Sequence, residues 1–451
     1  MDAQRMSDVL NPVFFKELRQ AKRSRFLLGL SVVVALIEGI VAFSYYRYGQ
    51  AQTAQDVDGL RVLTGIYCFL MVLCVGAGGL FPVSVMAQER RVEGLDPLLG
   101  TCLTPGQVLW GKLQAVLVGM GIPMAISAPL WLFLRPYFRH FGFVAVFGLV
   151  LLAVLGALVV ACYREGAMNT ARNWGLVPFL SLAPIFGTMA GCFMDLERTV
   201  HWDEAVFFVA LGVSAAVMLL ALAYGALCHR QEERTRVLRM AAVVLAIAWL
   251  PLTGLLCDLE WKKAFAAWGA GVTVAALGLL FLASCERPLP SRRQAEEAPR
   301  NLFLRLLAFP WTTGASGGIV FATLLAAVGG VASYIGICLR GRGAQNDVLM
   351  LSLCFCYALV YAGVAQAMRR WVRLHPLVTY ICIGALIMVV NSVLLVFGVE
   401  WALVFTPFFW VSEWWHSGLG SVVLATGALG IALNFYFWCD FLDHLSAKAK
   451  E

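Results

Sequence analysis

Charged residues are scarce in this chain. Asp, Glu, Lys and Arg make up only 14% of its 451 residues, whereas 61% are hydrophobic. An average soluble domain has roughly 25% charged and 45–50% apolar residues. A soluble protein of this length needs more charge to cover its surface, and a disordered chain needs low hydrophobicity and high charge. The composition therefore excludes an ordinary soluble enzyme and a disordered chain, and it predicts an integral membrane protein.

Residues that build metal sites and disulfides are few or poorly placed. The chain has 6 histidines, and most of its 13 cysteines lie inside apolar runs, without the CxxC spacing of zinc sites. His201 lies among carboxylates in 195–204, and Glu413 and His416 have the Glu-x-x-His spacing of diiron bundles, which needs a second copy. We interpret these segments as a solvated loop and an aromatic belt. We therefore expect no metal, cofactor or disulfide in this chain.

Long apolar runs, in contrast, are abundant. A helix needs about 20 apolar residues to cross a hydrocarbon core of roughly 30 Å. Twelve runs reach about this length, and they lack the alternation of barrel strands. The predicted fold class is therefore all-α: a polytopic integral membrane protein with about 12 transmembrane helices. The runs lie near 26–46, 62–86, 113–134, 141–163, 174–194, 205–228, 237–257, 264–284, 315–339, 348–368, 376–399 and 419–439.

The basic residues predict the orientation of these spans. If the N-terminus is cytoplasmic, the inner segments hold 25 of the 34 Lys and Arg residues. The positive-inside rule therefore favours N- and C-termini that are both cytoplasmic. The net charge of +7 is then explained by topology, and we expect no nucleic-acid partner. Residues 1–25 are too polar for a signal peptide and no cleavage site follows, so 26–46 is predicted to be a signal anchor.

A basic amphipathic helix is predicted before the first span. Pro12 suits the first turn of a helix, and Asn11 suits its N-cap. We expect this helix, within 1–25, to lie flat on the inner leaflet and to turn into the first span. The alternative is a plain basic tail that obeys the positive-inside rule. Leu10, Phe14, Leu18 and Ala21 recur at helical spacing, and Lys16, Arg19, Lys22 and Arg23 occupy the rest of the wheel.

A second amphipathic segment, 88–112, follows the second span. It mixes charged residues with leucines and is too polar to cross the membrane. A short helix held at the membrane surface by flanking spans can dock in the groove of a partner and carry rigid-body motion through the bilayer. We therefore predict that this segment binds a cytoplasmic partner.

These two segments resemble those of the permease subunits of type-2, exporter-class ABC transporters, most closely the permeases of multicopper-enzyme maturation and gliding motility. In that family an elbow helix precedes span one, and a coupling segment lies between spans two and three. This chain departs from the family pattern at Cys102, where proline is usual, and at Pro97. The elbow matches are Asn11, Pro12, Lys16, Glu17, Leu18 and Arg19. The coupling matches are Glu89, Arg90, Gly94, Leu95, Asp96, Leu98, Leu99, Thr101, Leu103, Gly111 and Lys112.

The resemblance implies a permease subunit of an ATP-driven exporter in the bacterial inner membrane, and not an enzyme. ATP and magnesium would bind to a separate ABC ATP-binding subunit, and the chain would pair with an identical or a second permease within membrane lipid. The resemblance covers residues 8–230, and the six-span unit is 26–230. The remaining residues, 231–451, are predicted to form six additional spans, with a cytoplasmic linker at 285–314. The implied ATPase-coupling residues are Glu89, Arg90, Arg91, Gly94, Asp96, Leu98, Leu99 and Thr101.

The chain lacks a nucleotide-binding loop of its own. Residues 106–112 fit the pattern GxxxxGK, but Leu113 follows where a phosphate-binding loop has Ser or Thr. No buried strand precedes this segment, and an apolar span follows at once. Any ATP hydrolysis must therefore come from another chain.

Three features inside the predicted spans could carry function or packing. Glu38 lies near the middle of the first span, where an acid costs about 2.5–3.5 kcal/mol, so we expect it to face the protein interior or a cavity. Its role is either functional, in substrate passage or proton handling, or structural, as a hydrogen bond to a neighbouring helix. Asn391 and Asn434 suit interhelical hydrogen bonds, and the glycines of 76–79 suit close helix packing.

Two other functions stay open at this point. A polytopic membrane enzyme acting on lipid-linked substrates would need clustered acids or histidines on one membrane face, and His201, Asp203 and His416 are the only candidates. A non-transporting scaffold would use the six additional spans to recruit other membrane proteins.

Overall fold

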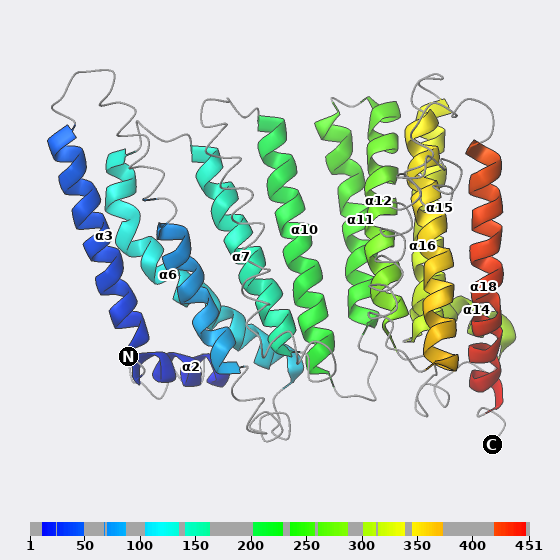
Figure 1. Cartoon of the computed structure of the whole chain (residues 1–451), viewed down its shortest axis with the longest axis horizontal. Helices are drawn as coiled ribbons and strands as arrows, with labels where there is room; N and C mark the ends of the chain where they lie inside the picture. Colours follow the sequence, from blue (N-terminus) through cyan, green and yellow to red (C-terminus); the bar gives the residue numbers. More distant parts are fainter. Residues whose placement is uncertain are drawn as a thin grey trace, which may run out of the picture. The chain divides into compact units, whose positions relative to one another are not determined.

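The protein is helical throughout the residues that the structure describes (Figure 1). The computed structural model describes residues 11–23, 25–48, 67, 70–86, 104–134, 140–162, 202–228, 235–257, 260–286, 301–312, 314–338, 345–372 and 419–447. No strand occurs within these ranges. The predicted all-α class is therefore confirmed for this part of the chain.

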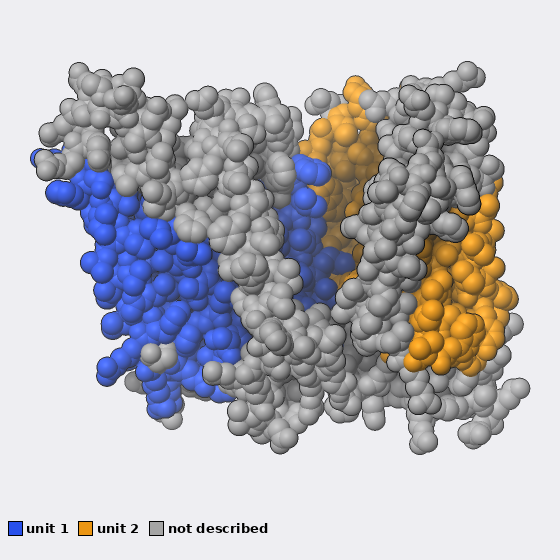
Figure 2. Space-filling view, viewed as in Figure 1, with its two compact units in different colours: residues 1–229 blue, residues 230–451 orange. Residues whose placement is uncertain are grey.

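The chain forms two compact units, Met1–His229 and Arg230–Glu451, coloured separately in Figure 2. The predicted division between a six-span unit and the additional spans lies next to this boundary. The permease-like character of the first unit stays a prediction.

Unit 1 is built on a central helix, α6. Its helices are α2 (Pro12–Arg23), α3 (Phe26–Tyr48), an unlabelled helix Leu70–Met86, α6 (Pro105–Leu134), α7 (His140–Cys162) and α10 (Trp202–Leu227). Helices α2, α3 and α10 all pack on α6, and α7 packs along α10. Apolar residues of α2, helix 70–86, α6, α7 and α10 form one buried core, so the predicted elbow belongs to the folded body of the unit.

The glycines of 76–79 allow the close helix packing that we predicted. A Cβ atom on Gly78 would lie 2.1 Å from the carbonyl oxygen of Gly119 in α6, and one on Gly119 would lie 2.3 Å from the carbonyl oxygen of Gly78. A side chain at either position would therefore push helix 70–86 away from α6.

Unit 2 consists of α11 (Arg236–Leu256), α12 (Trp261–Ser284), α14 (Leu302–Ala308), the short 3₁₀ helix η2 (Phe309–Trp311), α15 (Ala315–Cys338), α16 (Gln345–Trp371) and α18 (Leu419–Ala447). Helix α12 packs along α15, and α16 packs along α18. The α12–α15 contact again has glycine on both sides, because a Cβ atom on Gly269 would lie 2.3 Å from the carbonyl oxygen of Gly329.

Asn434 joins α18 to α16, as its predicted role requires. Its Nδ2 donates to the carbonyl oxygen of Leu359 at 2.9 Å, and its Oδ1 accepts from Gln366 Nε2 at 3.3 Å. Both side chains are buried. Asn391 lies outside the described residues.

Eight described helices are long and apolar enough to cross a membrane, so the chain has the character of a multi-pass membrane protein. Ten of the twelve predicted spans overlap a described helix, and the other two, 174–194 and 376–399, lie outside the described residues. The total of twelve spans and the cytoplasmic termini stay predictions. The eight segments are Phe26–Ser44, Pro105–Leu130, Val209–Leu227, Arg236–Leu256, Trp261–Ser284, Ala315–Gly336, Leu351–Trp371 and Val423–Asp440.

Two boundaries differ from the predictions. The helix of the third span begins at Pro105, not near residue 113, so residues 105–112 of the predicted coupling segment are the first two turns of α6. The predicted linker at 285–314 contains the folded elements α14 and η2. Residues 105–112 pack on α2, and η2 packs on α15.

Candidate functional site

The two segments that carry the family resemblance meet in unit 1, where α2 packs on the first turns of α6. We call this contact the elbow junction. It consists of Asn11, Val13, Phe14 and Glu17 from the elbow, and of Gln107, Gly111 and Lys112 from α6. Helix α2 runs crosswise at the foot of α3 in Figure 1.

Asn11 caps α2 and ties it to α6. The Asn11 Oδ1 atom accepts a hydrogen bond from the backbone N–H of Val13 at 3.0 Å, so the predicted N-cap is confirmed. The amide nitrogen of the same side chain donates to the carbonyl oxygen of Gln107. One residue therefore fixes both the start of α2 and its distance from α6.

A capping box fixes the start of α6 at the junction. The backbone N–H of Gln107 donates to Thr104 Oγ1 at 3.3 Å, and the backbone N–H of Thr104 donates to Gln107 Oε1 at 2.9 Å. Pro105 occupies the first helical position, where its missing N–H costs nothing. The pattern Thr-x-x-Gln was present in the sequence and could have located this helix start.

A buried ion pair forms the centre of the junction. Lys112 Nζ donates to Glu17 Oε1, and the two side chains are only 1% and 2% exposed. Glu17 lies in the second turn of α2, and Lys112 lies in the second turn of α6. Loss of one partner would leave the other charge buried without its counter-ion, which typically costs about 3–5 kcal/mol.

Gly111 lets the two helices approach each other. A Cβ atom there would lie 2.8 Å from Val13 Cβ, 2.9 Å from Asn11 Oδ1 and 3.0 Å from the backbone nitrogen of Phe14. Any side chain at position 111 would press on the first turn of α2. Both residues of the Gly-Lys pair that matches the family pattern therefore have a structural role: Gly111 permits the close approach of the helices, and Lys112 pairs with Glu17.

One face of α2 is buried within unit 1, and the basic residues lie on the exposed side. Val13, Glu17 and Ala21 are buried, whereas Leu18 is 40% exposed. Lys112 neutralises Glu17 and allows it to face α6, and the contact of the apolar stripe through Leu18 with the leaflet stays a prediction. Arg19, Lys22 and Arg23 are exposed or end the helix, as expected for a basic outer face.

A sharp corner joins α2 to α3. Arg25 has φ of 53°, a left-handed conformation that is uncommon for any residue except glycine. Helix α3 starts at the next residue, and its first backbone bond runs from the N–H of Gly29 to the carbonyl oxygen of Arg25. Arg25 therefore contributes a left-handed turn between the elbow and the first span.

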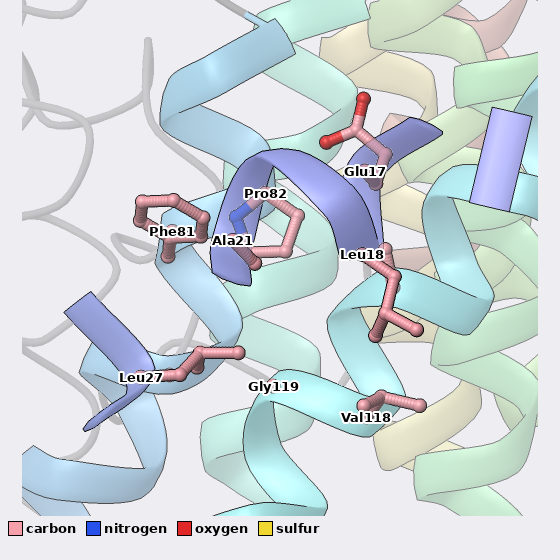
Figure 3. Close-up of a pocket in the computed structure, with 10 residues that line it drawn as sticks. Glu17, Leu18, Ala21, Leu27, Phe81, Pro82, Val118 and Gly119 are labelled. Atoms are coloured by element: carbon pink, nitrogen blue, oxygen red, sulfur yellow. The ribbon is translucent and has the colours of Figure 1, made fainter. Parts of the chain in front are cut away.

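A small pocket lies beside the junction (Figure 3). Leu18, Ala21, Leu27, Phe81 and Val118 contribute to its apolar walls, and Glu17 is the one charged residue among those that line it. It offers no second polar side chain to orient a polar ligand, so we assign it no catalytic role.

The remaining predicted coupling residues lie outside the described residues. This applies to Glu89, Arg90, Arg91, Gly94, Asp96, Leu98, Leu99 and Thr101. The GxxxxGK pattern of 106–112, in contrast, is described and is helical throughout, and its lysine binds Glu17. The segment therefore has no phosphate-cradling loop geometry.

Glu38 lies on the same face of α3 as the buried residues Val34 and Val41, which contact Tyr67 and Met71. Its Oε1 atom is buried, and within the described part of the chain no hydrogen-bond partner contacts it. The side chain as a whole is half-buried, and its orientation and its role stay predictions.

A second buried cluster, in unit 2, was missed by sequence reasoning. Arg239 is 2% exposed and donates to the carboxylate of Glu286 at 2.9 Å and to the carbonyl oxygen of Pro310 at 2.8 Å. It also donates to the carbonyl oxygen of Thr312, and Arg369 donates to that of Glu286. Burial raises the pKa of the Glu286 carboxyl, although Arg239 and the backbone N–H of Gly314 oppose this rise. The cluster holds together the adjoining ends of α11, α12, α15 and α16.

No group of three or more potential metal ligands occurs within the described ranges. His201 and His416 lie outside them, and nothing is described of the side chain of Asp203. Comparisons with protein-family models, curated proteins and solved structures found no match to this chain.

Proposed function

We propose that this chain is the membrane-spanning permease subunit of an ATP-driven ABC exporter in the bacterial inner membrane. A separate ATP-binding subunit hydrolyses ATP, and this chain, paired with an identical or a second permease, moves an unidentified substrate. The chain itself carries out no catalysis in this account.

The elbow junction is the observation that carries the proposal. Glu17 in the elbow and Lys112 in α6 are 95 residues apart in the sequence. The elbow and the coupling segment were each predicted from a separate motif. Their contact supports a common role, since an unrelated basic tail would have no reason to bury an acid against α6. The tail interpretation of residues 1–25 is therefore less consistent with the packing of α2.

The junction has the properties of a mechanical link. Residues 88–103 lead directly into α6, whose second turn is bound to α2 by the Glu17–Lys112 pair. Two opposite charges attract strongly where water is excluded, so α2 and α6 resist separation. A displacement of the coupling segment by an ATP-binding subunit would therefore move α6 and the elbow together, and through the Arg25 corner would reach α3.

The test is co-purification from native membranes in a mild detergent. The full chain should retain an ATP-hydrolysing chain, and the charge-reversed variant R90E/R91E should lose it because the coupling segment forms the contact. The matched control is K262E/K263E, which reverses two adjacent charges in the first turn of α12 in unit 2 and should retain the ATPase. Purification of the wild-type chain without any ATPase, or equal loss in both variants, would contradict the proposal.

A further inference from the structure

Helix α14 exposes an unusual amount of apolar surface for its length. Phe303 is 72% exposed, Leu307 65%, Leu306 50% and Leu304 49%. These residues are four of the seven in the helix, and together they form an exposed apolar patch. Exposed apolar patches of this kind mark a contact with another protein or with a membrane.

The 3₁₀ helix η2 sets the position of α14 along the spans. Phe309, only 4% exposed, packs against Val320 of α15 and against Trp438 and Leu442 of α18. The ring of Trp311 lies 5.4 Å from that of Phe321. Val320 is five residues into α15, which places the contact about 7.5 Å along that helix from its first residue. Figure 1 likewise draws α14 at the level of the lower part of α18.

Arg239 fixes the position of the segment that follows α14. It binds the carbonyl oxygens of Pro310 and Thr312, immediately after α14. Gly317 allows the turn to fold back on α15, because a Cβ atom there would lie 2.6 Å from the Thr312 carbonyl oxygen. The exposed face of α14 is therefore held at a fixed depth and is not the mobile end of a linker.

This depth identifies the partner. A helix that lies in a membrane interface buries its apolar face about 5–10 Å into the boundary between headgroups and acyl chains. The α14 anchor lies within that distance of the end of a span-length helix, and α15 itself exposes apolar residues such as Leu324.

We propose that α14 is an interfacial membrane helix of unit 2, which inserts Phe303, Leu304, Leu306 and Leu307 among lipid acyl chains next to the headgroups. The leaflet is the one at the N-terminal end of α15, which the basic residues predict to be cytoplasmic. This proposal does not rest on the exporter function, because the residues that carry it are in the other unit.

The test is depth-dependent quenching of a genetically encoded fluorescent amino acid in the full chain, reconstituted in lipid vesicles. The probe replaces Leu304 or Leu307, and the reference probe replaces Leu324, which is 53% exposed near the middle of the α15 span. Vesicles contain lipids with a nitroxide either near the headgroup or near the end of the acyl chain. Because the fluorophore is the side chain of the encoded amino acid, its signal is free of background from native tryptophans and from labelled native cysteines.

We expect probes at 304 and 307 to be quenched more by the shallow nitroxide, and the probe at 324 to be quenched more by the deep one. Absence of quenching at 304 and 307 while 324 is quenched would show that water or another protein covers α14, and would overturn the proposal. Deep quenching equal to that at 324 would overturn it as well. Unchanged thermal unfolding of each labelled chain shows that the probe has not displaced the helix.

Discussion

The Glu17–Lys112 pair makes a sharp prediction about stability. In Lys112→Met, the carboxylate of Glu17 stays at a site where it is 2% exposed, but the Lys112 ammonium is gone. In Glu17→Leu, the ammonium of Lys112 is left in the same way. In the double variant E17L/K112M, neither charge remains, and two apolar side chains occupy the contact.

The magnitude follows from the burial of both groups. Breaking a buried pair by removing one partner costs about 3–5 kcal/mol, whereas replacing both by apolar residues is often neutral or stabilising. For a unit of 229 residues, 1 kcal/mol shifts the melting temperature by about 2–4 °C. Each single variant should therefore melt roughly 6–20 °C below wild type, and the double variant should melt close to wild type.

The assay is thermal unfolding of the full chain in lipid nanodiscs. The matched control is Lys263→Met, because Lys263 pairs with Glu260 at 2.7 Å while both side chains are largely exposed, at 43% and 56%. Such surface pairs contribute about 0.2–1 kcal/mol. Two results would contradict the stabilising role of the buried pair. One is that the single variants at 17 and 112 shift the melting temperature no more than this control does. The other is that the double variant melts as low as the single variants.

Three further predictions concern packing and ionisation. Gly111→Ala should lower stability by about 1–3 kcal/mol because its Cβ meets Val13, whereas Gly121→Ala in the same helix has nothing within 4 Å and should not, as thermal unfolding will show. In unit 2, Gly269→Ala should lower the melting temperature by separating α12 from α15, and Gly271→Ala, whose Cβ would have nothing within 4 Å, should leave it unchanged. Burial raises the pKa of Glu286 above 4.5, so the folded state binds its proton more tightly than the unfolded chain does. The stabilisation that the Glu286 proton contributes is then fully present below pH 4.5, and it is lost as the pH rises through the folded-state pKa of this group. In Glu286→Gln, this part of the pH dependence of unfolding should disappear. A profile of unfolding against pH that matches wild type would contradict the prediction.

Local features of the fold could be predicted from the sequence. Long apolar runs located the helices, since burying apolar length in lipid leaves little choice of structure. Asn11 and Pro12 predicted the start of α2 because capping depends on adjacent residues only. The glycines of 76–79 predicted a close contact, although not that Gly119 would be its other side.

Tertiary pairing could not be predicted in the same way. Glu17 was assigned to the elbow and Lys112 to the coupling segment, but nothing local indicates that residues 95 apart neutralise each other. The burial of Glu17 could therefore not be predicted, since an unpaired acid belongs in water. Arg239 was treated as part of an apolar span, and only its contacts with Glu286 and Pro310 reveal a cluster.

The central claim is that residues 88–112 transmit the action of an ATP-binding subunit to the spans. The most direct measurement is photo-crosslinking in native membranes, with a photoreactive amino acid at Leu98 and, as reference, at Lys263 in α12. The account predicts that the probe at 98 captures a chain that is labelled by a photoreactive ATP analogue, and that the probe at 263 captures none. An intact chain whose probe at 98 captures no ATP-binding chain would contradict it.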